Sequence, residues 1–122
     1  MLKRTSSALL ALFAASMLAT SGNAHPALKS SSPAVESTAA APTEIRLSFS
    51  EGVILKLCSV ELKDQAGQNI ATGKLAADPK DKKQLVVPLQ GPLKAGTYTV
   101  KWNVVSADTH RVNGTYSFKV DR

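Results

Sequence analysis

Cysteine and methionine are nearly absent from this chain of 122 residues. Cys58 is the single cysteine, so no internal disulfide can form. Its neighbours Leu57 and Val60 predict a small buried hydrophobe rather than a reactive thiol. The two methionines, Met1 and Met17, lie within the first 24 residues. The remainder of the chain therefore has no thioether sulfur.

Long hydrophobic runs are also lacking. The most apolar stretch, residues 8–19, is only 12 residues long, whereas a membrane-spanning helix needs about 20. Lys3 and Arg4 precede this stretch, and the small residues Gly22 and Ala24 follow it. This pattern is typical of a secretory signal peptide that is cleaved after Ala24. We expect residues 1–24 to be removed on export and residues 25–122 to form one mature domain.

Positive charge is in modest excess and is scattered. Beyond residue 24, 13 Lys and Arg stand against 9 Asp and Glu, a net charge of +4. The one basic cluster, Lys80, Lys82 and Lys83, is interleaved with Asp78 and Asp81. This mixture predicts a solvated loop and argues against a nucleic-acid-binding surface.

Apolar and polar residues alternate along five stretches of the mature region, as in half-buried strands. The apolar positions are Ile45, Leu47 and Phe49; Val60 and Leu62; Leu85, Val87 and Leu89; Tyr98, Val100, Trp102 and Val104; and Tyr116, Phe118 and Val120. Pro88 predicts a sheet edge or a strand end, and Asn113-Gly114 predicts a turn. The pattern favours an all-β fold, an antiparallel sandwich or small barrel with Trp102 in its core.

Histidine is scarce, and its positions are informative. Cleavage after Ala24 would make His25 the first residue, where the α-amine and the imidazole together can chelate a divalent metal ion. The other histidine, His110, lies two residues after Asp108, so in extended backbone both side chains project to the same side. Three nitrogens and one oxygen suit Cu(II) or Ni(II), and copper has the highest affinity of the divalent ions for such ligands.

Pro26 and the missing methionines refine this hypothesis. Pro26 has no backbone N–H that could become a further ligand, so Asp108 and His110 are the natural candidates to complete a site with His25. Without thioethers the domain should prefer Cu(II) to Cu(I). Zinc is an alternative metal, and a lone histidine is also often an ordinary surface residue. The sequence does not show whether the two ends of the domain meet.

Several segments together resemble the CopC family of periplasmic copper-resistance proteins. They are HP at 25–26, LKSSSP at 28–33, IRLSFSE at 45–51, AGTYTVKW at 95–102, VSADTH at 105–110 and GTYSFKV at 114–120. The resemblance implies a cupredoxin-like or immunoglobulin-like Greek-key β-sandwich in the periplasm. It also implies a Cu(II) site made by His25, Asp108 and His110.

The same resemblance suggests further roles. Glu51 stands where the family has an acidic residue close to the metal, although an acidic residue after a strand is usually only solvated. A CopD-like inner-membrane copper transporter is the implied partner, and we expect a monomer without enzymatic activity. Residues 58–84 depart from members with a stretch rich in Met and His, since they contain neither, so the chain resembles the branch that binds only Cu(II).

Two other functions remain open from the sequence. A terminal histidine paired with a second histidine is similar to the histidine brace of copper-dependent polysaccharide oxygenases. Such an enzyme needs an open coordination position, which Asp108 would fill here. The other alternative is a sandwich module for adhesion or pilus assembly that binds no metal.

Overall fold

The computed structural model describes residues 27–121. Their strands are β1 (Leu28–Ser32), β2 (Thr38–Ala39), β3 (Glu44–Phe49), β4 (Ser59–Lys63), β5 (Asn69–Ile70), β6 (Ala76–Asp78), β7 (Asp81–Pro88), β8 (Gly96–Val105) and β9 (Arg111–Val120). A short 3-10 helix, η1 (Leu55–Leu57), is the one helical segment in this range. No helix among these residues has the length and apolar character needed to cross a membrane.

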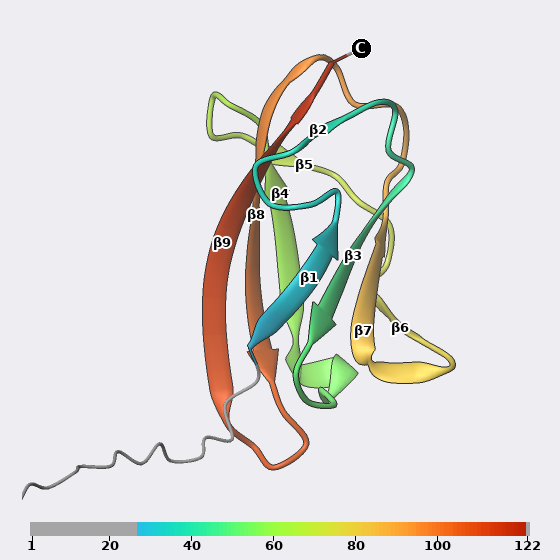
Figure 1. The fold of residues 1–122 in the computed structure, drawn as a ribbon, viewed down its shortest axis with the longest axis vertical. Helices are drawn as coiled ribbons and strands as arrows, with labels where there is room; N and C mark the ends of the chain where they lie inside the picture. The colour runs from blue at the N-terminus through green and yellow to red at the C-terminus, as the bar shows by residue number, and fades with distance from the viewer. Residues whose placement is uncertain (1–26, 122) are drawn as a thin grey trace, which may run out of the picture.

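The strands form two sheets that face each other, as Figure 1 shows. One sheet has the order β1-β3-β7-β6, and the other has the order β2-β9-β8-β4-β5. The chain passes from one sheet to the other after β1, after β2, after β3, after β5 and after β7. These crossovers are the Greek-key connections of a β-sandwich, so the predicted all-β sandwich is confirmed.

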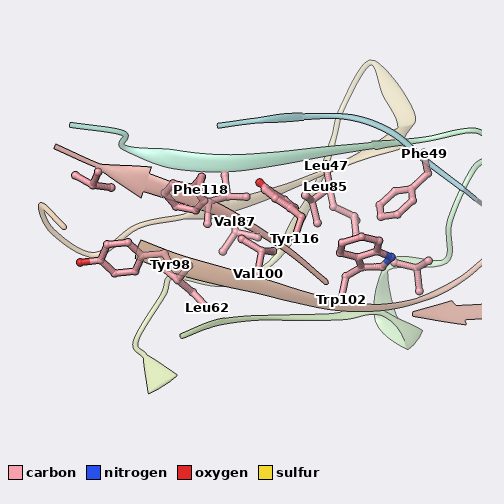
Figure 2. Packing of buried hydrophobic residues seen from close by; sticks show 13 residues of the cluster. Leu47, Phe49, Leu62, Leu85, Val87, Tyr98, Val100, Trp102, Tyr116 and Phe118 are labelled. Carbon is pink, nitrogen blue, oxygen red and sulfur yellow. The ribbon is translucent and has the colours of Figure 1, made fainter. Parts of the chain in front are cut away.

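The alternating apolar residues form the core between the sheets. Ile45, Leu47 and Phe49 on β3 are at most 1% exposed. Figure 2 shows Leu47 and Phe49 among the inward side chains of β7, β8 and β9, and Ile45 belongs to the same buried cluster. Trp102 is a core residue, as expected: its ring lies 6.2 Å from that of Phe49 and 6.3 Å from that of Tyr116, measured between centroids. The period of two along the sequence therefore identified the inner faces of both sheets.

One predicted turn is wrong. Asn113 and Gly114 lie inside β9, where they pair with Asn103 and Trp102 of β8. A Cβ atom on Gly114 would lie 2.5 Å from Cζ2 of Trp102. The glycine is therefore needed because the indole lies against the backbone, and not because the chain reverses there.

Other local expectations were met in part. Pro88 is the last residue of β7, although this strand is internal to its sheet. Cys58 is only half-buried, but it packs against the core cluster, and burial raises the pKa of its thiol. The side chains of Lys80, Lys82 and Lys83 are exposed, as expected, but Lys82 and Lys83 lie on β7 and not in a loop.

Candidate metal-binding site

The turn between β8 and β9 carries the predicted Asp-x-His pair. The Ser106 N–H donates to the His110 carbonyl at 2.8 Å, and the Thr109 N–H donates to the Ser106 carbonyl at 2.8 Å. Thr109 has a φ of 72°, in the left-handed region that a threonine rarely adopts. The two strands are therefore joined by a tight, internally bonded turn with Asp108 at its tip.

The side chains of Asp108 and His110 lie close together, as expected, but the backbone between them is not extended. Asp108 Oδ1 lies 3.1 Å from His110 Nδ1, and both side chains are about half exposed, at 51% and 47%. The positive φ of the intervening Thr109 folds the chain so that the two side chains converge. The pair thus presents a carboxylate and an imidazole to solvent at one point on the surface.

Ser106 lies directly beneath this pair and was missed in the sequence. Its side chain is 0% exposed, and its hydroxyl donates a hydrogen bond to Asp108 Oδ1. This bond, followed by the contact with His110, holds the pKa of Asp108 below its usual value. The carboxylate is therefore anionic at neutral pH. The Ser-x-Asp-x-His spacing was the signal that could have identified Ser106.

The loop that contains Glu51 packs against the same turn. The Ala107 N–H donates to the Gly52 carbonyl at 3.0 Å, and Val53 forms an antiparallel bridge with Ser106. Glu51 is half-buried in this loop. Within residues 27–121, no hydrogen bond joins its carboxylate to Asp108 or His110. The structure therefore places Glu51 in the neighbouring loop without a hydrogen bond to the pair.

The first described residue lies at this same end of the sandwich. Ala27 donates its N–H to Ser50 Oγ at 2.9 Å, and its carbonyl accepts the Ser50 N–H at 2.8 Å. Ser50 is two residues from Gly52, whose carbonyl is bonded to the turn. In Figure 1 the start of β1 and the β8–β9 turn lie at one end of the molecule, and the C-terminus lies at the other.

His25 itself lies outside the described residues. Among residues 27–121, no group of three or more His, Cys, Asp and Glu side chains is arranged to hold a metal ion. Asp108 and His110 therefore supply at most half of a four-coordinate site, one oxygen and one nitrogen. Two nitrogens from another part of the chain would complete the set that Cu(II) prefers.

Comparisons with known proteins match nearly all of the described chain. Residues 28–121 match the CopC domain model. Copper resistance protein C of Pseudomonas syringae pv. tomato is 40% identical over 126 residues, which cover 98% of each chain. The crystal structure of PcoC, a methionine-rich copper resistance protein from Escherichia coli, has a TM-score of 0.73 at 41% identity, covering 80% of this chain and all of that one.

A third relative is much longer. The copper transport protein CutJ of Bacillus subtilis is 28% identical over 100 residues, which cover 81% of this chain but only 18% of that protein. The domain match and the likeness of fold agree. The chain therefore belongs to the CopC family, and the relatives named above are copper resistance and copper transport proteins.

Proposed function

We propose that this protein binds Cu(II) in the periplasm and stores it or passes it on without catalysing a reaction. The ligands in this proposal are the α-amine and imidazole of His25, freed by cleavage after Ala24, together with Asp108 and His110. The observation that carries it is the location of Ala27 at the same end of the sandwich as the Asp108–His110 pair.

Chain length is compatible with this ligand set. His25 precedes Ala27 by two residues, and two residues span up to about 7 Å. Ala27 is bonded to Ser50, and the neighbouring Gly52 is bonded to Ala107, the residue before Asp108. Only this short path separates the start of the described chain from the pair.

The donor types support Cu(II) rather than Cu(I). No methionine follows Met17, in contrast to PcoC, whose structure is described as methionine-rich. Cys58 donates its S–H to the Ile54 carbonyl, and burial raises the pKa of its thiol, so it is a poor thiolate ligand. Amine, imidazole and carboxylate ligands are those that Cu(II) accepts.

The surface supports a carrier rather than a polysaccharide oxygenase. Every aromatic residue among residues 27–121 is buried: Phe49, Tyr98, Trp102, Tyr116 and Phe118. This part of the chain therefore has no aromatic platform for stacking a sugar ring. With four ligands in place, no equatorial position would stay open for oxygen.

The proposed recipient of the copper is a CopD-like integral membrane transporter. The relationship to CutJ supports this choice, because a domain like this one forms 18% of a longer copper transport protein. In CutJ the CopC-like domain and the rest of the copper transport protein are one chain. In this proposal a separate CopC domain would instead bind to a separate transporter.

A one-residue extension tests the site. The full chain is expressed, the exported protein is purified, and mass spectrometry locates the cleavage site. A variant with one alanine inserted between Ala24 and His25 is prepared in the same way. The extended protein should fold equally well without metal but bind Cu(II) several orders of magnitude more weakly, because the amine no longer belongs to the histidine. Equal affinities of the two proteins in a competition titration would overturn the proposed ligand set.

A further inference from the structure

Ser106 is the single polar residue with a fully buried side chain among residues 27–121. A buried hydroxyl costs free energy unless it is hydrogen-bonded. Here the hydroxyl makes its bonds to the Asp108–His110 pair and not to the core. It donates to Asp108 Oδ1, and it accepts the His110 backbone N–H at 3.2 Å.

The backbone of Ser106 is held as firmly as its side chain. Its N–H and carbonyl close the turn through His110 and Thr109. On its other side it is bridged to Val53. A side chain that is 0% exposed on such a backbone has little rotational freedom. Ser106 is therefore a fixed point from which both Asp108 and His110 are oriented.

The contacts also distinguish the two carboxylate oxygens of Asp108. Both the Ser106 hydroxyl and His110 Nδ1 approach Oδ1. The other oxygen, Oδ2, accepts neither of these two bonds. A metal ion that left both bonds intact would therefore meet Asp108 more readily through Oδ2 than through Oδ1.

We infer that Ser106 is a positioning residue for copper: its hydroxyl orients Asp108 and His110 before the metal arrives. The inference rests on the proposed function, since it concerns the same pair of ligands. Partners of metal ligands typically contribute about 10- to 100-fold to metal affinity. Ser106 thus belongs to the binding machinery although it does not touch the metal.

The experiment compares Ser106→Ala with the wild-type protein, both exported and cleaved before His25. Ser37→Ala is the matched control, because it removes a hydroxyl that donates to a single backbone carbonyl, that of Ala34, beside Lys119 at the end of β9 away from the turn. Cu(II) affinity is measured by competition titration, ligand geometry by EPR of the copper-loaded protein, and folding of the metal-free protein by thermal unfolding. Ser106→Thr, which keeps a hydroxyl, tests for rescue.

Ser106→Ala should bind Cu(II) about 10- to 100-fold more weakly, with an altered or heterogeneous EPR signal, while Ser37→Ala and Ser106→Thr resemble wild type. A folded Ser106→Ala protein with wild-type affinity and spectrum would overturn the inference. If the alanine variant does not fold, Ser106→Thr decides: a folded threonine variant that has lost tight binding overturns it as well. Failure of the wild-type protein to bind Cu(II) would instead refute the proposed function itself.

Discussion

Ala27 and Ser50 are joined by two hydrogen bonds, one from the Ala27 N–H to the Ser50 hydroxyl at 2.9 Å and one from the Ser50 N–H to the Ala27 carbonyl at 2.8 Å. This clamp fixes the beginning of β1 beside the loop after β3. Because His25 is two residues earlier, the clamp sets where the proposed N-terminal ligands start. It gives the hydroxyl of Ser50 a role that a strand-end serine would not otherwise have.

Ser50→Ala should weaken Cu(II) binding modestly. The variant loses one of the two hydrogen bonds, worth about 0.5–1.5 kcal/mol, so the dissociation constant should rise about two- to tenfold. Ser48→Ala, on the outward face of the preceding strand β3, is the control and should bind as wild type does. The measurement is a competition titration of the cleaved proteins. An unchanged affinity in Ser50→Ala would show that the clamp does not position the N-terminus for copper.

His110→Ala should weaken Cu(II) binding more than Asp108→Ala, by roughly 100-fold against roughly tenfold, because imidazole nitrogen is the better ligand for copper.

Tryptophan fluorescence gives a readout for these titrations. Trp102 is the single tryptophan of the chain and lies on β8, four residues before Ser106. Four residues of strand span about 14 Å. The fluorescence of Trp102 should be quenched by Cu(II), and the titration midpoint should move with each variant.

The control for this pair is Asp121→Ala, which removes an exposed carboxylate just beyond the end of β9. It should leave the copper titration unchanged. If Asp108→Ala or His110→Ala titrates like wild type, that residue is not a ligand. Quenching by Zn(II) to the same extent would point to a conformational effect instead of copper itself.

Gly114→Ala should destabilise the fold. The added Cβ would lie 2.5 Å from Cζ2 and 2.9 Å from Cη2 of the buried Trp102, and overpacking of this kind costs about 1–3 kcal/mol. Gly91→Ala is the matched control, since an added Cβ there has no neighbour within 4 Å and should change the free energy of unfolding by less than about 0.5 kcal/mol. Urea unfolding measures both. Equal stabilities would mean that the indole moves aside freely.

Acidification should destabilise the protein, and Asp78 should contribute. The Lys80 backbone N–H and then the Arg46 guanidinium lower the pKa of Asp78 from its usual 3.8. A carboxyl with a lower pKa in the folded state stabilises the fold above the unfolded pKa, and this contribution is lost as the pH falls through the folded pKa. Thermal unfolding of Asp78→Asn between pH 6 and pH 2.5 should therefore show a shallower loss of Tm than wild type. An identical pH profile would exclude Asp78 from the acid response.

Local patterns were sufficient to predict the strands. Alternation of apolar and polar residues identified the central parts of β3, β4, β7, β8 and β9, because a strand with one face on a core must alternate with a period of two. The same reasoning failed at Asn113-Gly114. A glycine after an asparagine indicates a turn by its local preference. Here the glycine lies within a strand instead, because the indole of Trp102 on the neighbouring strand leaves no room for a Cβ atom.

The sequence by itself determined the residue types that define the candidate site: two histidines, an Asp-x-His spacing, and no methionine beyond residue 17. The tertiary structure decided that Asp108 and His110 converge through the left-handed Thr109, that the hydroxyl of Ser106 is buried beneath them, and that Ala27 is held near the same turn by Ser50. Ala27 and Asp108 are far apart along the chain, and only pairing across the sandwich brings their segments to one end. Such contacts depend on the packing of the whole fold, which no local pattern contains.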